Sequence, residues 1–212
     1  MSHYYPIYVE LRNKPVLVVG GGVVALRKVK TLLEHGAIVR IVSPKLHPQL
    51  LELVDEERCI WKEKEYSGED LQDEILVFSC TEIEEVNMAV ARDAQAAKRL
   101  VNVVDDPDKC TFIVPSTLEQ GDLSIAVSTG GSSPMVARQI RAELEEQYGQ
   151  VYGIYLSLLK DWRKTVKAKL NPEQKEKFWQ RVTDGEVLSL LKNGQLEEAK
   201  GVMAKCFQSL LD

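Results

Sequence analysis

A glycine-rich stretch near the start of the chain has the spacing of a dinucleotide-binding loop. The pattern Gly20-x-Gly22-x-x-Ala25 directly follows the apolar run Val16–Val19, which predicts a strand buried on both faces. In this setting Gly20 permits a tight turn, Gly22 lets the backbone approach a pyrophosphate, and the small Ala25 lets the next helix pack closely. The N-terminus of that helix attracts the phosphate charge. We therefore expect a dinucleotide site at Gly20 and Gly22; the alternative is a glycine turn that serves packing alone.

The residues after the second predicted strand leave the cofactor open between NAD and NADP. A dinucleotide site usually has an acidic residue at this point, which binds the hydroxyl groups of the adenine ribose. The chain has Ser43, Pro44 and Lys45 there instead. Ser43 can hydrogen-bond a ribose, and Lys45 or Arg40 can bind the 2′-phosphate that distinguishes NADP. For Lys45, an ordinary exposed lysine in a loop is the alternative.

Thr81 follows the next well-marked apolar run, Ile75–Cys80. Ligands of open α/β sheets bind outside the carboxyl ends of the strands, so Thr81 is a candidate contact for the nicotinamide half of the cofactor. A threonine at this position can also cap the helix that is predicted to follow. The two roles are compatible.

A pair of carboxylates follows the last strand of this region, in the sequence Asn102-Val103-Val104-Asp105-Asp106-Pro107. A dehydrogenation needs a proton acceptor beside the hydride acceptor, and Asp105 is our first candidate for that general base. Asn102, in the strand itself, is predicted to contact the cofactor. The alternative for the two aspartates is a plain turn ahead of Pro107.

A second polar loop precedes a helix that is predicted to begin at Pro134. Its backbone amides, its hydroxyls and the helix N-terminus suit an anion such as a carboxylate or a phosphate, and Arg138 and Arg141 follow in the helix. The alternative is a helix cap at Ser133 with ordinary surface arginines. We predict substrate contacts at Arg138 and at the loop residues Ser128, Thr129, Gly130, Gly131 and Ser132.

The elements that must position these residues follow from the hydrophobic pattern. Strands are predicted at residues 16–19, 37–42, 59–61, 75–80 and 100–104, with helices at about 24–35 and 83–98. Gly36 is expected to end the first helix. Because strands alternate with helices, the chain is predicted to be of the α/β class, with a Rossmann-type, doubly wound parallel sheet.

The pattern changes near residue 115. The runs Thr111–Pro115 and Leu123–Ser128 predict an antiparallel strand pair around a turn at residues 120–122, followed by a helix from Pro134 to about Tyr148. The remainder is predicted as three or four short helices, with breaks at residues 171–172, 184–185 and 193–194. We expect a Rossmann domain at 1–115, a strand-and-helix dimerisation segment at 116–150, and a small all-α domain at 151–212.

Composition narrows the class of protein. The chain has 212 residues, 44% hydrophobic and 28% charged, and its net charge is −5 without a concentrated basic stretch, which argues against a nucleic-acid partner. The four cysteines form no C-x-x-C pair and the three histidines lack ligand spacing, so neither a disulfide framework nor a metal site is expected. There is no signal sequence and no apolar run long enough to span a membrane, so we expect a cytoplasmic protein.

Five segments form a combination that is more specific than the glycine pattern. They are Pro6–Leu11, Val18–Ala25 with Arg27 and Lys28, Asn102–Asp105, Thr111–Ser116, and Ala126–Pro134 with Ala137 and Arg138. This combination resembles the precorrin-2 dehydrogenase family, the NAD-dependent step of sirohaem synthesis, which occurs alone or as the N-terminal module of a sirohaem synthase. The resemblance is close over about residues 4–150 and looser in the helical tail.

The resemblance implies that NAD⁺ oxidises precorrin-2, a carboxylate-rich tetrapyrrole, to sirohydrochlorin. It also implies a homodimer in which the segment after about residue 115 makes much of the contact, with the tetrapyrrole in a cleft between domains. The family's functionally important aspartate aligns with Asp105, and a serine that is phosphorylated in some relatives aligns with Thr129. The family's cofactor contacts align with Gly22, Val23, Val24, Ser43, Pro44 and Lys45.

Two other functions stay open. Some relatives also insert Fe²⁺ into sirohydrochlorin, with the same aspartate assisting deprotonation of the pyrrole nitrogens, so a bifunctional dehydrogenase and ferrochelatase is one alternative. The other is a non-catalytic Rossmann sensor of the NAD/NADH ratio whose helical tail contacts a partner. A sensor does not need the segment ending in Asp105, and the tail lacks a basic recognition helix.

Overall fold

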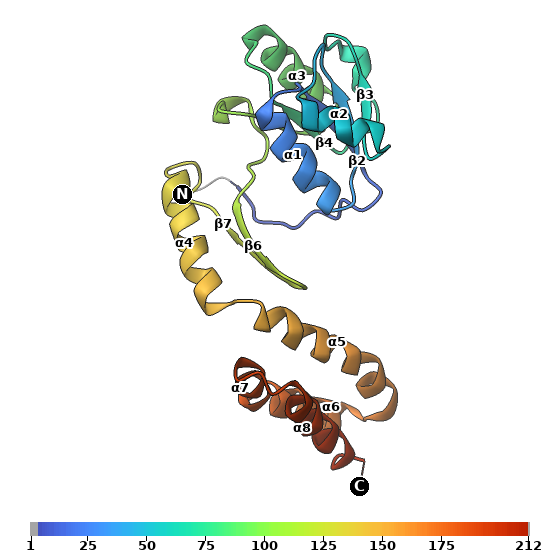
Figure 1. The fold of residues 1–212 in the computed structure, drawn as a ribbon, viewed down its shortest axis with the longest axis vertical. Helices are drawn as coiled ribbons and strands as arrows, with labels where there is room; N and C mark the ends of the chain where they lie inside the picture. The colour runs from blue at the N-terminus through green and yellow to red at the C-terminus, as the bar shows by residue number, and fades with distance from the viewer. Residues whose placement is uncertain (1–3, 212) are drawn as a thin grey trace. The chain divides into compact units, whose positions relative to one another are not determined.

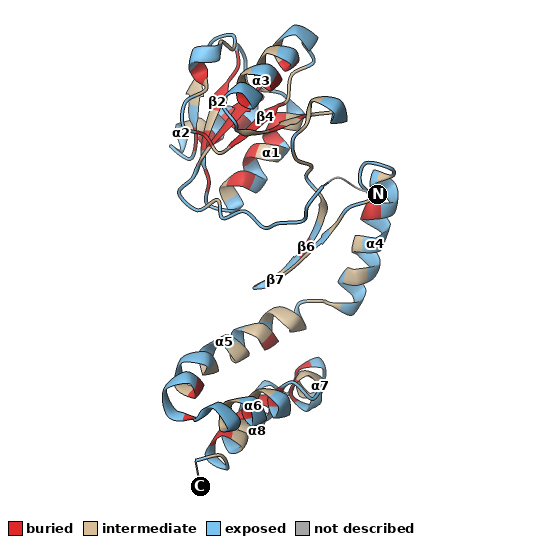
Figure 2. Cartoon of the chain, turned by 180° about the vertical axis from the view of Figure 1, so that it is seen from behind, coloured by how far each residue is buried: buried red, intermediate tan, exposed pale blue. Residues whose placement is uncertain are grey.

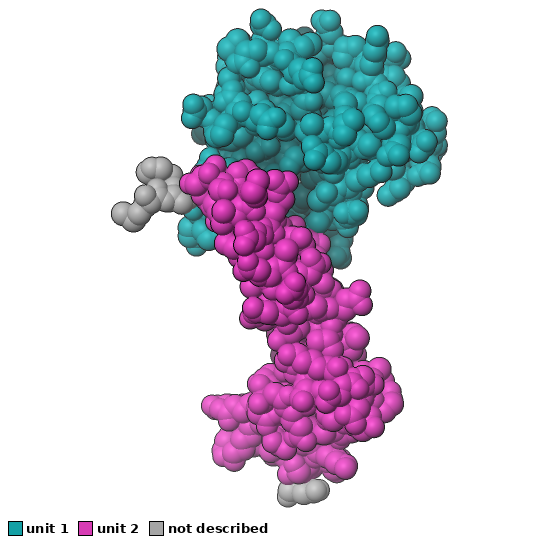
Figure 3. Space-filling view, turned by 60° about the vertical axis from the view of Figure 1, so that its left-hand side comes forward, with its two compact units in different colours: residues 1–114 teal, residues 115–212 magenta. Residues whose placement is uncertain are grey.

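The computed structural model describes residues 4–211 of the chain. These residues belong to two compact units, unit 1 (Met1–Val114) and unit 2 (Pro115–Asp212), which Figure 3 distinguishes by colour. The predicted division into three parts, with a further boundary at residue 150, stays a prediction. Within the described residues, no helix combines the length and the apolar character that crossing a membrane requires.

Unit 1 contains a five-stranded parallel sheet in the order β3-β2-β1-β4-β5 (Figure 1). Val18 of β1 pairs with Ile41 of β2 on one side and with Phe78 of β4 on the other. The predicted Rossmann-type α/β fold is confirmed. The strands are β1 (Pro15–Val19), β2 (Ile38–Val42), β3 (Ile60–Lys62), β4 (Leu76–Ser79) and β5 (Leu100–Val103). The helices are α1 (Val23–Glu34), α2 (Pro48–Asp55) and α3 (Glu84–Ala96), with short 3₁₀ turns η1 (Gly68–Asp70) and η2 (Pro107–Lys109).

The sheet of unit 1 is covered on both faces by helices. Val16 and Val18 of β1 pack in a hydrophobic cluster with α1 and α2, whereas Leu17 and Val19 pack in a second cluster with α3. These four residues are at most 2% exposed. Figure 2 shows buried residues, in red, in β2, β4 and α1 of the same unit. Burying each such side chain contributes roughly 1.5–3 kcal/mol to stability, so β1 is the firmest support for the loop that follows it.

The end of α1 determines where β2 begins. Gly36 adopts a φ of 73°. Its N–H donates to the Leu33 carbonyl at 3.0 Å, and the Ala37 N–H donates to the Leu32 carbonyl at 3.0 Å. A glycine in the left-handed region closes a helix in this way at little cost, which confirms the predicted helix end. The hydrophobic pattern did not predict α2, which begins with Pro48 after the capping residue His47.

The predicted strand at Thr111–Pro115 is wrong. The hairpin of unit 2 consists of β6 (Ser116–Gln120) and β7 (Leu123–Val127), which are antiparallel, as expected, around the predicted turn. Thr111 meets Val101 of β5 through two hydrogen bonds, one from its own N–H and one accepted by its hydroxyl, both at 2.8 Å. Because the side chain takes a place that a backbone carbonyl would fill in a strand, the ladder stops after this one residue.

The rest of unit 2 is helical. After α4 (Pro134–Gln147) come α5 (Val151–Lys169), α6 (Pro172–Val182), α7 (Glu186–Lys192) and α8 (Leu196–Gln208), with the three predicted breaks between the last four. Phe178 and Met203 are fully buried at the centre of these four helices, and the Trp162 ring lies 5.6 Å from the Phe178 ring. This aromatic core gives the helices of the tail a hydrophobic centre of their own.

The turn of the hairpin lies against the start of α5. A methyl group on Gly153 would come within 2.9 Å of the Gln120 carbonyl oxygen, and one on Gly121 within 3.2 Å of the Gly153 Cα. The Lys160 ammonium is 2.8 Å from the Asp122 carboxylate beside this contact. Both side chains of the ion pair are exposed, so the close backbone approach of the two glycines is the firmer of the two links.

Candidate functional site

Gly20 makes the tight turn that leaves β1. Its φ is 112°, and a methyl group there would lie 2.6 Å from the Cys80 carbonyl oxygen. Both observations require glycine, because an L-residue is strained at this φ and its Cβ would collide with backbone. The turn therefore runs directly beside the end of β4. The role of Gly20 in cofactor binding stays a prediction.

Gly21 holds the loop after β2 against the glycine loop. A methyl group on Gly21 would lie only 2.0 Å from the Lys45 carbonyl oxygen, and the Gly21 carbonyl accepts a hydrogen bond of 2.7 Å from the His47 N–H. Gly21 was not among the residues predicted from the sequence. Its signal was the presence of three consecutive glycines where the dinucleotide pattern asks for only two.

Gly22 leaves open space at the N-terminus of α1. A methyl group added to Gly22 would meet no heavy atom within 4 Å. Gly22 is the N-cap of α1, no side chain caps the helix, and its first turn contains no acidic residue. The first amide groups of the helix consequently point outward without an internal partner and carry the positive end of the helix dipole. Val23 is 59% exposed beside this opening. The arrangement fits a pyrophosphate.

The adenosine end of the predicted site lies after β2. Ser43 is buried, and its hydroxyl donates a 2.7 Å hydrogen bond to the Lys45 carbonyl. A hydroxyl oxygen that donates its one hydrogen can still accept, so a ribose hydroxyl can bind Ser43 as a donor. Pro44 and Lys45 are exposed. The prediction that these three residues contact the cofactor stays a prediction.

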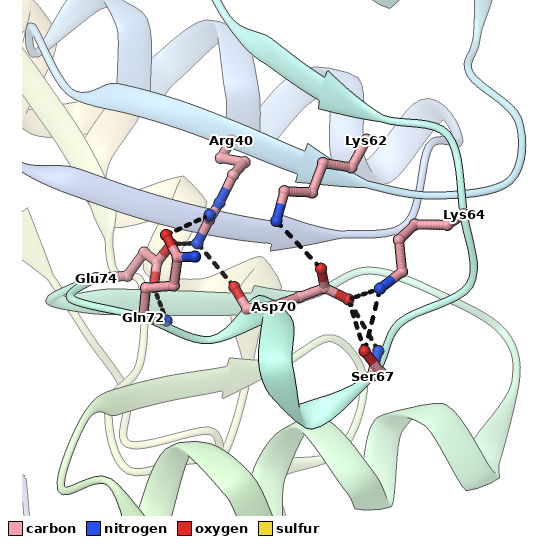
Figure 4. A network of polar contacts seen from close by, with 7 residues as sticks. All are labelled: Arg40, Lys62, Lys64, Ser67, Asp70, Gln72 and Glu74. Atoms are coloured by element: carbon pink, nitrogen blue, oxygen red, sulfur yellow. Dashed lines mark hydrogen bonds and ion pairs between the residues drawn. The ribbon is translucent and has the colours of Figure 1, made fainter.

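Arg40 is not available for a 2′-phosphate, contrary to one of the predicted options. Figure 4 shows its guanidinium engaged with Glu74, the Gln72 side chain and the Asp70 backbone. The Arg40 side chain is 13% exposed and that of Glu74 is 2% exposed, so removing either partner would leave a buried charge uncompensated. Lys45 is left as the cation near the ribose end of the loop.

Asp70 extends this polar network to the β3 side (Figure 4). Its buried carboxylate accepts hydrogen bonds from Lys62 at 3.3 Å and from the Ser67 N–H at 3.0 Å, and it pairs with Lys64 at 2.8 Å. Burial alone would raise the pKa of Asp70, but these hydrogen bonds and the lysine charges outweigh burial and lower it. The network fixes the strand edge of unit 1 and leaves its charged groups satisfied.

Asn87 of α3 holds the end of β4 in place. Its side-chain oxygen accepts a 2.7 Å hydrogen bond from the Ser79 hydroxyl, and its amide nitrogen donates to the Thr81 carbonyl at 3.2 Å. Thr81 itself precedes the N-cap residue Ile83 by two positions, and its hydroxyl accepts the Ile83 N–H at 3.1 Å. The hydroxyl of Thr81 thus serves the start of α3. Its contact with the nicotinamide stays a prediction.

Asp105 stands at the end of β5 in a backbone conformation that few residues adopt. Its φ is 62° and its side chain is exposed. The left-handed region costs a non-glycine residue roughly 1–2 kcal/mol, although Asp and Asn tolerate it best. The Val104 N–H donates to the Ser79 carbonyl at 3.0 Å, so the chain stays beside β4 up to the residue before Asp105. The turn therefore presents this carboxylate at the carboxyl end of the sheet.

Asp106 differs from its neighbour because it is paired. Its carboxylate binds Lys109, which also lies 2.8 Å from Glu84. The hydrogen bond from Lys109 holds the pKa of Asp106 below its ordinary value. Of the two adjacent aspartates, Asp106 is thereby used for the turn, whereas the role of Asp105 as a general base stays a prediction.

Asn102 supports the segment that follows η2. Its amide nitrogen donates to the Phe112 carbonyl at 3.1 Å and lies 3.5 Å from the Cys110 sulfur. This contact fixes the path of the chain after β5. A cofactor contact of Asn102 stays a prediction.

The second polar loop satisfies many of its own polar groups. The Thr129 hydroxyl accepts the Ser133 N–H at 3.1 Å and donates to the Ser133 carbonyl at 3.0 Å. The Ser133 hydroxyl caps α4 by accepting the Val136 N–H at 3.3 Å, and the Ser128 hydroxyl accepts the Gly130 N–H at 3.0 Å. The structure therefore shows the helix cap at Ser133. Substrate contacts at Arg138 and at the loop residues Ser128, Thr129, Gly130, Gly131 and Ser132 stay predictions; Arg138 is exposed.

No group of three or more His, Cys, Asp or Glu residues suited to a metal ion occurs in the part of the chain that the structure describes.

Comparison with known proteins shows which family the chain belongs to. Three family models match in succession: an NAD(P)-binding model over residues 7–116, the sirohaem biosynthesis protein central region over 120–147, and the sirohaem synthase dimerisation region over 152–206. The chain belongs to the sirohaem synthase family. It corresponds to the NAD(P)-binding, central and dimerisation regions of that family.

Curated members of the family are similar over this part only. The chain is 41% identical over 199 residues to the sirohaem synthase of Mannheimia succiniciproducens and 37% identical over 204 residues to that of Neisseria meningitidis serogroup C. These matches cover 93% and 96% of the chain but 42% of each relative. The chain thus spans less than half the length of these relatives.

A solved structure has the same fold over nearly the whole chain. It is described as SirC, precorrin-2 dehydrogenase, and it is 26% identical with a TM-score of 0.81. The match covers 95% of the chain and 100% of that protein. The two units described above therefore account for the whole of the solved SirC chain.

Proposed function

We propose that the chain catalyses the NAD-dependent dehydrogenation of precorrin-2 to sirohydrochlorin. The observation that carries the proposal is the meeting of an open glycine loop and an exposed carboxylate at one end of the parallel sheet. Gly22 follows β1 and Asp105 follows β5, and β4 lies between these strands. The similarity to SirC, a precorrin-2 dehydrogenase, supports the choice of substrate.

Each residue of the site has a part that suits this reaction. NAD⁺, when bound, supplies the acceptor for a hydride. The free amides at the start of α1 hold the pyrophosphate, and Ser43 and Lys45 hold the adenosine ribose. Asp105 accepts the proton that the macrocycle loses and, because it is exposed, passes it on to water. Thr81 and Asn102 contact the nicotinamide half.

The decisive test replaces Asp105 by asparagine. Asp105→Asn removes the charge but keeps a residue that tolerates the left-handed backbone, so the turn is retained. Turnover of precorrin-2 with NAD⁺, followed by absorbance, should fall by about 10²-fold or more, the usual effect of losing a general base. Binding of NADH should be unchanged.

Asp106→Asn is the matched control. It removes the neighbouring carboxylate, which pairs with Lys109, and should leave turnover within about twofold of the unmodified protein. Full turnover by Asp105→Asn would remove Asp105 from the mechanism. Tight NADH binding by the unmodified protein without any turnover of precorrin-2 would favour the sensor instead.

NAD is the proposed cofactor in preference to NADP. The support is that Arg40, one of the two cations predicted as able to bind a 2′-phosphate, is held by Glu74. The same assay with NADP⁺ in place of NAD⁺ tests this choice, because a lower KM for NADP⁺ would overturn it.

A cytoplasmic homodimer is the form in which we propose the protein acts. The match to a dimerisation region supports the dimer, as do exposed apolar side chains on α4, where Met135 is 72% and Val136 44% exposed. Sedimentation of the purified protein measures its mass directly.

The four cysteines are free thiols, which suits a reducing compartment. Ferrochelatase activity stays a prediction, tested by anaerobic insertion of Fe²⁺ into sirohydrochlorin.

A further inference from the structure

Lys28 is a half-buried cation beside the end of β4. It lies in α1, and its ammonium sits 5.7 Å from the centre of the Phe78 ring. This distance is within the range of a cation–π contact. The Phe112 ring packs edge-on against Phe78 at 5.4 Å, so the ammonium and two aromatic rings form one cluster, which we call the Lys28 cluster. All three residues belong to unit 1.

The Lys28 ammonium lacks an anionic partner in the described part of the chain. Its recorded contact is with the Phe78 ring, whereas Lys30 on the same helix is exposed and donates to the Gln49 side chain at 2.9 Å. Burial lowers the pKa of Lys28, and the positive charge of Arg27 adds to that effect against an opposing contribution from Cys80. A half-buried cation in this position gains most from an anion that arrives from outside.

Neither phosphate end of a dinucleotide accounts for this cation. The ribose loop at Ser43–Lys45 follows β2, and β2 and β4 lie on opposite sides of β1. The pyrophosphate position is at the Gly22 end of α1, whereas Lys28 lies six residues further along, about 9 Å along the axis. The Lys28 ammonium instead lies over the Phe78 ring of β4.

The chemistry of the cluster suits a flat conjugated ring that carries carboxylates. Phe78 is 3% exposed, whereas Phe112 is half-buried. Aromatic rings pack against such a macrocycle, and an ammonium at their edge pairs with a carboxylate. We propose that Lys28 is a specificity-determining residue that binds a carboxylate of the tetrapyrrole substrate. This inference rests on the proposed function for the identity of the substrate.

The test replaces Lys28 by methionine. Lys28→Met keeps the length and the apolar stem over Phe78, so the variant should fold, which its thermal unfolding checks. The KM for precorrin-2 should rise roughly tenfold, equivalent to about 1.4 kcal/mol, while kcat and the KM for NAD⁺ stay unchanged. Lys28→Arg should restore most of the affinity. Lys30→Met, which removes the same charge from the exposed face of α1, should behave like the unmodified protein.

The outcomes separate this inference from the proposed function. An unchanged KM for precorrin-2 in Lys28→Met, or a rise confined to the KM for NAD⁺, would overturn the role of Lys28 while leaving the dehydrogenase intact. If the unmodified protein does not turn over precorrin-2, the proposed function fails. Titration with sirohydrochlorin, followed by absorbance, then tests the role of Lys28 in binding a tetrapyrrole. Equal affinity of the unmodified protein and Lys28→Met for sirohydrochlorin would also overturn the inference, as would absence of binding to the unmodified protein.

Discussion

Two glycine-bearing loops each lead into a helix in this molecule, but they treat the helix N-terminus in opposite ways. The loop before α1 leaves the first turn without a side-chain cap, and the position of Gly22 is open. The loop before α4 has Ser133 as a cap and Thr129 bonded to both backbone groups of Ser133. By composition, both loops looked suited to anions.

The difference shows that glycine and hydroxyl content alone does not define an anion site. What matters is whether the amides of the first turn are already satisfied. In the first loop no side chain caps them, and the glycines fix the loop by close backbone contacts with the Lys45 and Cys80 carbonyls. In the second loop the side-chain hydroxyls already accept hydrogen bonds from backbone N–H groups of the same loop and helix. An anion there could therefore bind only the remaining amides and Arg138.

The largest expected effect comes from filling the tight contact of the first loop. Gly21→Ala places a methyl group 2.0 Å from the Lys45 carbonyl oxygen, so the loop after β2 must move. We expect unit 1 to lose about 3 kcal/mol or more in its free energy of unfolding, measured by chemical denaturation. Gly131→Ala in the second loop meets no atom within 4 Å and should cost about 1 kcal/mol, because of its φ of 90°. Equal losses of stability in Gly21→Ala and Gly131→Ala would contradict the difference that we infer between the two loops.

A charge at Gly22 should separate stability from cofactor binding. Gly22→Asp supplies a good N-cap for α1 and should leave stability the same or raise it by roughly a few tenths of a kcal/mol. The new carboxylate would repel a pyrophosphate, so the Kd for NADH should rise roughly 100-fold by fluorescence titration. Ser132→Asp adds the same charge to the second loop and should leave NADH binding unchanged. Unaltered NADH affinity in Gly22→Asp would contradict the phosphate site.

The smallest effect should come from removing the cap of the second helix. Ser133→Ala leaves the Val136 N–H without its partner and should cost about 1 kcal/mol of stability. Thermal unfolding measures the change, and the KM for NAD⁺ should not alter. Ser132→Ala, an exposed neighbour, should stay within about 0.5 kcal/mol. A loss of NAD⁺ affinity in Ser133→Ala would show that the two loops are not as separate in role as we infer.

The sequence predicted the parallel sheet because its signals are local. Val16–Val19 is a continuous apolar run before glycines, and Gly36 ends α1 where the pattern indicates. The strand at Thr111–Pro115 was wrong because apolar composition does not show that Thr111 uses its side chain to replace a ladder bond with Val101. The same composition does not show that Ser116 is where the hairpin begins.

The candidate site could be predicted only where a local pattern in the sequence marks its residues. Gly20, Gly22 and Asp105 each stand at a strand end, which the pattern located. Contacts between residues far apart in the sequence were not predicted. Examples are Arg40 with Glu74, which removed one option for a 2′-phosphate, and Lys28 with Phe78. Such contacts depend on which strands are neighbours in the sheet, and the spacing of residues along the chain does not indicate that.

The close approach of Gly121 and Gly153 has a consequence for exchanging parts between relatives. The two glycines lie in regions that separate family models describe, 120–147 and 152–206, yet a Cβ on Gly153 would lie 2.9 Å from the Gln120 carbonyl oxygen and one on Gly121 would lie 3.2 Å from the Gly153 Cα. In a chimaera that joins these two regions from different family members, a side chain at either position would therefore press on backbone that comes from the other parent.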